Sequence, residues 1–127
     1  MKNQQKILVI LAHPDDETLV SGTLALCTKK GASVCLVSAT DGGGGWAPGG
    51  ISEKELSAIR RESLRKACAT LGIQRLEFFE ERSRLPFCLN GKNYTAVIDQ
   101  HRQWVMDLIG DISPDAVITF GPEGLTG

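Results

Sequence analysis

The sequence predicts an α/β fold in which helices cover both faces of a mainly parallel sheet. Four short aliphatic and β-branched runs recur along the chain, at residues 6–11, 33–39, 75–79 and 115–120. Such runs are typical of strands that are buried on both faces of a parallel sheet. The first two runs are separated by enough residues for one crossover helix, so they should form a parallel βαβ unit with a right-handed connection.

Composition agrees with one compact domain over residues 1–127. Hydrophobic residues make up 42% of the chain and charged residues 23%, which indicates neither disorder nor a membrane span. A net charge of −1 provides no general attraction for nucleic acid. The cysteines at 27, 35, 68 and 88 lack Cys-x-x-Cys spacing, so we expect reduced and mostly buried thiols. The first apolar run ends in a charged turn instead of a cleavage site, which predicts a cytoplasmic protein.

The first strand leads into the turn Ala-His-Pro-Asp-Asp-Glu-Thr at residues 12–18. The residues after it predict an amphipathic helix that ends at Lys29, Lys30 and Gly31. Its apolar stripe is expected at Leu19, Val20, Thr23, Leu24 and Cys27. The turn should therefore lie at the carboxyl end of a strand, where open α/β sheets bind ligands.

The residue types of this turn suit a metal-dependent hydrolase. His13 and Asp16 offer a nitrogen and an oxygen that Zn²⁺ or another divalent cation accepts, although a catalytic zinc site needs three protein ligands. Asp15 could then serve as a general base beside metal-bound water. An alternative is structural, because acidic residues in a first helical turn cap free N–H groups and suit the helix dipole.

The whole heptapeptide resembles the signature of the LmbE-like, PIG-L family of metal-dependent N-deacetylases, which remove acetyl groups from N-acetylglucosamine conjugates. The resemblance implies that His13 and Asp16 bind zinc and that Asp15 is the general base. It also implies that Arg60, twelve residues before Gly72, contacts the substrate. The family often has an acidic residue three positions after that arginine, where this chain has Ser63.

A second, weaker likeness follows the third strand, where the family frequently places an Asp-Arg pair that meets the sugar. Glu81-Arg82 is the nearest match, and a surface ion pair is the simple alternative.

Residues 40–50, Thr-Asp-Gly-Gly-Gly-Gly-Trp-Ala-Pro-Gly-Gly, predict a loop. The glycines do not match a phosphate-binding loop, which would follow the first strand and open its helix. Two interpretations remain open. The loop covers the site like a lid, with Trp46 stacked on a sugar ring, or it is an exposed loop whose Trp46 packs on the core.

Two further helices are predicted. Ser52 and Glu55 have the spacing of a capping box, and Gly72 should end the helix that they begin. Its buried stripe is expected at Leu56, Ile59, Leu64, Ala67, Cys68 and Leu71. An irregular connection over residues 80–91 precedes a helix from Tyr94 to Ile109. Its apolar side is expected at Val97, Ile98, Val105, Leu108, Ile109 and Ile112. His101 falls on this side and is expected to be a core residue rather than a metal ligand.

The predicted strand order is 3-2-1-4, a Rossmann-like arrangement that places the Gly121–Gly127 loop across the crevice from His13. In the family that the turn resembles, a His-Pro-Asp-His-like segment follows at this point and supplies the third zinc ligand. The resemblance thus implies a domain that is incomplete at its carboxyl end, with weak metal binding and little hydrolysis from these 127 residues alone.

The fourth strand is predicted to be buried but to leave an open sheet edge, which favours pairing with a second copy of the chain. The competing hypothesis is a Rossmann-like module without catalysis, which binds a partner through that edge.

Overall fold

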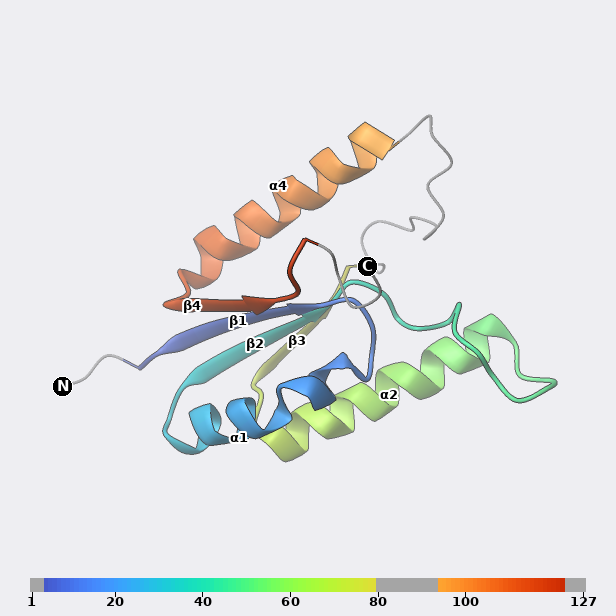
Figure 1. Ribbon diagram of the computed structural model, residues 1–127, viewed down its shortest axis with the longest axis horizontal. Helices are drawn as coiled ribbons and strands as arrows, with labels where there is room; N and C mark the ends of the chain where they lie inside the picture. Colours follow the sequence, from blue (N-terminus) through green and yellow to red (C-terminus); the bar gives the residue numbers. More distant parts are fainter. Residues whose placement is uncertain (1–3, 80–93, 123–127) are drawn as a thin grey trace.

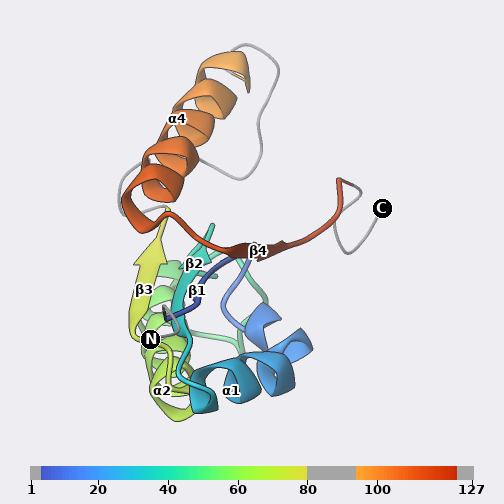
Figure 2. The ribbon, with the colours of Figure 1, turned by 90° about the vertical axis from the view of Figure 1, so that its left-hand side faces the viewer.

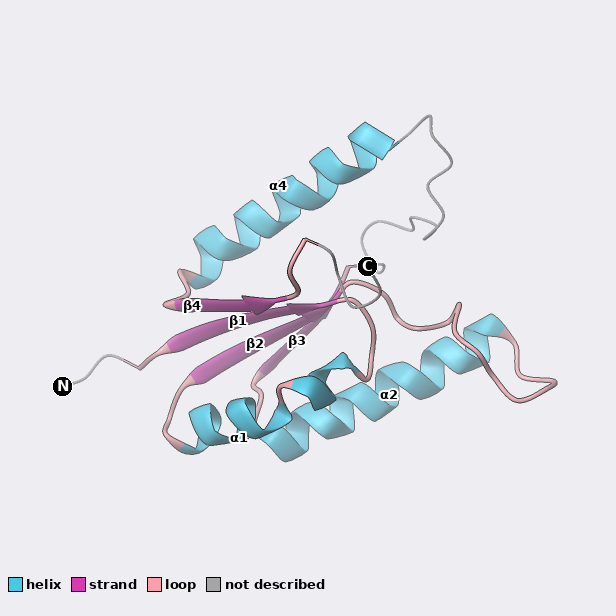
Figure 3. Cartoon of the chain, viewed as in Figure 1, coloured by secondary structure: helices cyan, strands magenta, loops and turns pink. Residues whose placement is uncertain are grey.

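The computed structural model describes residues 4–79 and 94–122, and its chain path is shown in Figure 1. Strands and helices alternate along this path (Figure 3). The strands are β1 (Lys6–Leu11), β2 (Ser33–Ser38), β3 (Arg75–Phe78) and β4 (Ala116–Thr119). The helices are η1 (Asp16–Leu19), a 3₁₀ turn, and the α-helices α1 (Ser21–Lys29), α2 (Glu53–Leu71) and α4 (Tyr94–Ile112).

The sheet has the order β3-β2-β1-β4, and every pairing in it is parallel. Helices α1 and α2 lie on one face of the sheet and α4 lies on the other (Figure 2). The predicted three-layer α/β fold, its strand order and the βαβ unit are therefore confirmed. This order makes β1 central and places the turn after β1 at the point where the chain reverses its direction across the sheet.

Alternating side chains of the central strands build two separate cores. Val9 of β1 and Leu36 of β2 face α1 and α2, where they pack with Leu24 and Leu64. Leu8 and its neighbours face α4 on the opposite side. Since both faces are covered, the central strands lack the polar alternation of a half-exposed sheet.

Strand β4 is not buried, and that expectation was wrong. Val117 and most of the strand are exposed, while Ile118 packs against the core on the α1 side. Within the part of the chain that the structure describes, β4 pairs only with β1, and α4 lies over the opposite part of the sheet (Figure 2). The aliphatic composition of β4 thus reflects its strand propensity more than its burial here.

The stripe predicted after the first turn is also partly wrong. Leu24 is fully buried, but Leu19 and Thr23 are exposed. For Leu19, the cause is that the helix does not start as an α-helix: η1 is a 3₁₀ turn, and Val20, with φ −123°, separates it from α1. A 3₁₀ turn has about 3.0 residues per turn, so residues before the break fall out of phase with the α-helical period.

Two other apolar residues lie outside the buried stripes of their helices. Ile59 is exposed because it lies roughly 130° around α2 from the centre of the face that contains Leu56, Leu64 and Cys68, at about 100° per residue. Ile109 lies at the margin of the α4 face centred on Leu108 and is also exposed.

Several expectations fall on residues outside the described ranges. They concern the connection over residues 80–91, the Glu81-Arg82 pair, Cys88 and the last five residues of the chain; the side chains of Val97 and Ile98 are likewise not described. Among the described helices, none has both the length and the apolar character needed to cross a membrane.

Candidate active site

The turn at residues 12–18 and the glycine-rich loop are fastened to each other at the carboxyl end of the sheet. The Ala39 N–H donates to the Leu11 carbonyl at 2.8 Å. The Thr40 N–H and hydroxyl both donate to the Ala12 carbonyl at 3.0 Å. These bonds continue the β1–β2 pairing past the strands, so the two loops start side by side.

His13 and Asp16 converge within this turn. The His13 backbone N–H donates to Oδ2 of Asp16 at 2.8 Å, and His13 Nδ1 lies 3.6 Å from the same oxygen. The His13 side chain is 44% exposed and that of Asp16 is 8% exposed. Pro14 between them is buried. The structure therefore brings together the imidazole and the carboxylate that the sequence spacing singled out.

Asp15 presents its carboxylate to solvent from an unusual backbone conformation. Its φ is 122° and its ψ is −22°, in a region that L residues rarely adopt. The side chain is 64% exposed, and Oδ2 lies 3.5 Å from Nη2 of Arg60. Arg60 comes from α2, so this ion pair joins two segments of the candidate site that are 45 positions apart in the sequence.

Gly42 makes room for the Arg60 side chain. A Cβ at Gly42 would lie 2.6 Å from Cδ of Arg60 and 3.3 Å from Cδ of Pro14, and its φ of +75° also disfavours a side chain. The Gly42 carbonyl accepts from Nη1 of Arg60 at 3.5 Å, and Gly45 closes the turn with an N–H bond to the same carbonyl. The base of the glycine-rich loop is therefore packed against the His-Pro-Asp-Asp turn.

Asp41 fastens this loop to α2, which sequence reasoning did not find. Its Oδ1 accepts from the Gly43 N–H at 2.9 Å, and its Oδ2 accepts from the Ser57 hydroxyl at 2.6 Å. Arg61 lies 3.5 Å from Oδ2 and also stacks over the Phe78 ring at 4.8 Å. The Asp-Gly sequence in the loop after β2 was a signal for the local turn, but the partners on α2 depend on the tertiary fold.

Trp46 lies at the exposed part of the loop. Its side chain is 86% exposed, so the interpretation in which it packs on the core is wrong. A flat apolar ring in this position is available for contact with a ligand. His101, by contrast, lies against the Phe79 ring on the α4 side of the sheet, with ring centroids 5.0 Å apart.

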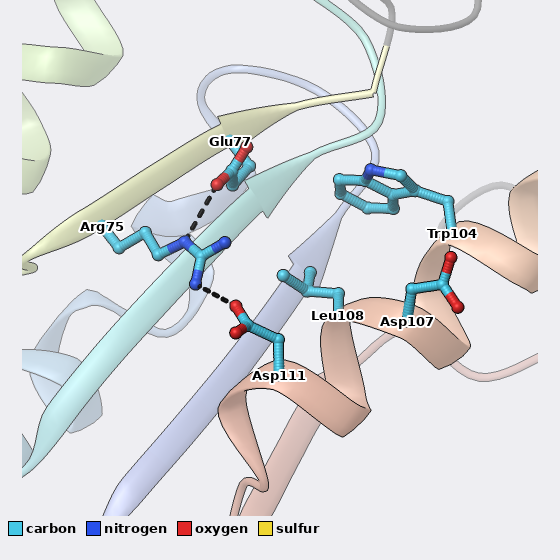
Figure 4. A pocket seen from close by; sticks show the side chains of 6 residues that line it. All are labelled: Arg75, Glu77, Trp104, Asp107, Leu108 and Asp111. Carbon is cyan, nitrogen blue, oxygen red and sulfur yellow. Dashed lines mark hydrogen bonds and ion pairs between the residues drawn. The ribbon is translucent and has the colours of Figure 1, made fainter.

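A pocket of about 240 Å³ lies between β3 and α4 (Figure 4), and none of its lining residues belongs to the His-Pro-Asp-Asp turn. Arg75 donates across it to Asp111 at 2.8 Å and to Glu77 at 2.9 Å, and these bonds raise the pKa of Arg75 above its ordinary value. The Arg75 guanidinium thus balances the negative charges of Glu77 and Asp111 and links α4 to β3. The lining residues are Arg75, Glu77, Trp104, Asp107, Leu108 and Asp111.

No group of three His, Cys, Asp or Glu residues that could hold a metal ion occurs within residues 4–79 and 94–122.

In a comparison with known protein families, residues 8–126 match the family described as PIG-L: GlcNAc-PI de-N-acetylase. A probable N-acetyl-alpha-D-glucosaminyl L-malate deacetylase 2 from Bacillus anthracis is 31% identical over 127 residues, covering 96% of this chain and 53% of that protein.

Solved structures of similar fold include the following two. The N,N'-diacetylchitobiose deacetylase from Pyrococcus horikoshii is 28% identical with a TM-score of 0.74, covering 91% of this chain and 40% of that chain. The 4-carboxy-2-hydroxymuconate hydratase GalB from Pseudomonas putida KT2440 has a TM-score of 0.72 at 23% identity, covering 90% of this chain and 46% of that chain. The second likeness shows the fold alone, which therefore does not specify the reaction. The chain spans about half the length of the curated relatives it matches.

Proposed function

This chain belongs to the PIG-L family, and we propose that it provides the general base and two metal ligands of an N-deacetylase that hydrolyses the acetamide of an N-acetylglucosamine-type conjugate. The observation that carries the proposal is the convergence of His13 and Asp16 beside the exposed carboxylate of Asp15.

The donor pair fits a zinc ion. Zinc ligands lie at roughly 2.0–2.1 Å in tetrahedral geometry, so two of them are separated by about 3.3 Å. The separation of His13 Nδ1 and Asp16 Oδ2 is 3.6 Å, within a few tenths of an ångström of that value. The second oxygen of Asp16 and the remaining lone pairs of Oδ2 leave the carboxylate able to bind a cation while it accepts the His13 N–H.

When bound here, zinc would acidify a water molecule and polarise the acetyl carbonyl. The role proposed for Asp15 is to accept the proton of the attacking water and return it to the leaving amine. Arg60 keeps the Asp15 carboxylate oriented and offers further N–H donors toward a sugar hydroxyl or carbonyl. Trp46 supplies an exposed apolar face for the sugar ring.

The substrate class rests on the relatives. The Bacillus anthracis relative is named for an N-acetylglucosaminyl malate and the Pyrococcus horikoshii enzyme for diacetylchitobiose, and both compounds contain an acetylated glucosamine nitrogen. We therefore propose an acetamido sugar as the group that enters the site, with the remainder of the conjugate left open.

The third zinc ligand is proposed to come from outside the described residues, since no group of three possible ligands occurs among these. Residues 1–127 alone should then bind zinc weakly and hydrolyse acetamido sugars slowly or not at all.

Zinc affinity of the 127-residue chain and its variants tests the ligand assignment. His13→Ala and Asp16→Ala should each abolish the residual affinity. Asp15→Asn should retain it, as should the control Glu62→Gln, which removes an exposed carboxylate paired with Arg65. Loss of zinc with Asp15→Asn would make Asp15 a ligand instead of the base.

Acetate release from N-acetylglucosamine conjugates, measured on the longest polypeptide that the gene encodes, tests the activity. Asp15→Asn should lower kcat by about 10²- to 10⁴-fold, the range for loss of a general base. Zinc binding without hydrolysis of any acetamido sugar would favour the binding module over the enzyme.

A further inference from the structure

Glu17 is a buried carboxylate for which the proposed reaction has no use. Glu17 is only 7% exposed, although it belongs to the same short turn as the exposed Asp15. Its Oε2 accepts the backbone N–H of Asp15 at 2.9 Å. A charged residue buried at this position requires a compensating interaction, and this hydrogen bond provides one.

The hydrogen bond acts on the residue with the unusual backbone. Asp15 has φ 122°, a conformation that a non-glycine residue keeps only when its surroundings hold it there. Its carbonyl is held from the other side, by the Thr18 N–H at 3.0 Å and the Thr18 hydroxyl at 2.7 Å. Both polar groups of the Asp15 main chain are therefore fixed, while its side chain reaches out to Arg60.

We infer that Glu17 is a positioning residue: it holds the Asp15 backbone in the conformation that directs the Asp15 carboxylate out of the turn. The inference rests on the proposed function in so far as Asp15 is the general base. Glu17 itself needs no contact with substrate or metal. A buried carboxylate with only a packing role would instead be replaceable by any side chain of similar size.

Two substitutions separate these roles because they keep the length of the side chain. Glu17→Gln retains a carbonyl oxygen that can accept the Asp15 N–H, whereas Glu17→Met does not retain such an acceptor. Glu62→Met is the matched control, since Glu62 is exposed and its carboxylate pairs with Arg65 on the surface of α2.

Hydrogen exchange of the Asp15 amide in the 127-residue chain, followed by NMR, tests the contact without any need for activity. Glu17→Met should accelerate this exchange by roughly tenfold or more, the loss expected for a hydrogen bond to a charged acceptor. In Glu17→Gln and Glu62→Met the exchange rate of the Asp15 amide should stay within about threefold of the wild-type rate. On a free-energy scale this is less than half of the tenfold change expected for Glu17→Met. Equal exchange in the Gln and Met variants would overturn the inference.

Glu17→Met combined with Asp15→Gly keeps the test decisive if the single variant does not fold. Glycine adopts φ 122° without strain, so the double variant should regain a cooperative unfolding transition. A double variant that stays unfolded would show that Glu17 is needed for a reason other than the Asp15 backbone.

The kinetic readout applies to the longest gene product. Glu17→Met should lower kcat on an N-acetylglucosamine conjugate by about 10²-fold with KM nearly unchanged, as expected for a misplaced catalytic group. Glu17→Gln should restore most of kcat. Fast amide exchange in Glu17→Met together with unchanged kcat would overturn the positioning role of Glu17, whereas Asp15 as the base is tested separately by Asp15→Asn. Unchanged exchange would refute the positioning contact itself.

Discussion

Replacing Gly42 by alanine should disturb the candidate site by moving Arg60. A Cβ at this position would lie 2.6 Å from Cδ and 2.8 Å from Nη1 of Arg60, distances that real Cβ contacts do not reach. Because Arg60 is a flexible side chain, the arginine should move rather than the backbone. The movement would separate Arg60 from both the Gly42 carbonyl and the Asp15 carboxylate.

Other glycines of the same loop allow the magnitude to be worked out. Gly50 has φ +93° with open space around it, so Gly50→Ala should show backbone strain alone, about 1–2 kcal/mol. Gly44 has open space and no positive φ, so Gly44→Ala should be neutral or stabilising by up to about 1 kcal/mol. Gly42→Ala combines similar strain with loss of a half-exposed ion pair worth at most about 1 kcal/mol, for a total of roughly 1–3 kcal/mol.

Urea unfolding of the three variants gives the stabilities, and acetate release by the longest gene product gives the function. Gly42→Ala should lower kcat/KM, while Gly50→Ala and Gly44→Ala should leave it near the wild-type value. If Gly42→Ala matches Gly50→Ala in both stability and kcat/KM, then the glycine does not control Arg60 and the proposed arrangement is refuted.

Two further predictions follow from shifted pKa values. Ser52→Ala should cost about 1 kcal/mol at pH 7 through loss of the helix cap. Hydrogen bonds from the Ser52 N–H and hydroxyl lower the pKa of Glu55 from its usual 4.5. Their contribution to the stability of the folded state is therefore present above pH 4.5 and is lost as the pH falls through the lowered pKa. The difference in the free energy of unfolding between the wild type and Ser52→Ala, measured by urea unfolding, should therefore be smaller at pH 3 than at pH 7. Burial raises the pKa of the Cys35 and Cys68 thiols from 9.0 to about 11, so alkylation at pH 8 should reach the less buried Cys27 before either of them. Labelling of Cys35 before Cys27 would contradict this difference in burial. The same pKa shifts favour the folded state below pH 9, and this contribution to stability should be lost as the pH rises toward 11.

Local signals were sufficient to predict the elements from the sequence. The aliphatic run at 6–11 became β1 with the predicted bounds, and the Ser52–Glu55 capping box and Gly72 mark the two ends of α2 as expected. Each of these features depends on residues within one turn or one strand of each other. The strand order followed from the βαβ connections and the reversal rule for open α/β sheets.

Burial was harder to predict, because it depends on what lies over each residue. Leu19 was misplaced by a 3₁₀ turn that the sequence pattern does not reveal, and β4 was expected to be buried although it is an edge strand in the described structure. Asp41 and Glu17 were missed for a related reason. An aspartate in a loop and a glutamate in a helical turn are common surface residues, and only the tertiary fold shows that Asp41 holds α2 and that Glu17 is enclosed.

The three consecutive acids of the turn show how one fold gives different roles to similar side chains. Asp16 and Glu17 are buried, and their carboxylate oxygens accept the backbone N–H groups of His13 and Asp15, three and two residues earlier respectively. Those two bonds fix the main chain on both sides of Pro14, so His13 and Asp15 keep defined positions while their side chains stay partly exposed. Asp15 is then the acid of the three that remains accessible to a water molecule outside the turn. Burial and hydrogen bonding within the turn thus support the proposal of Asp15 as the base, which its position beside His13 and Asp16 and the family resemblance had suggested from the sequence.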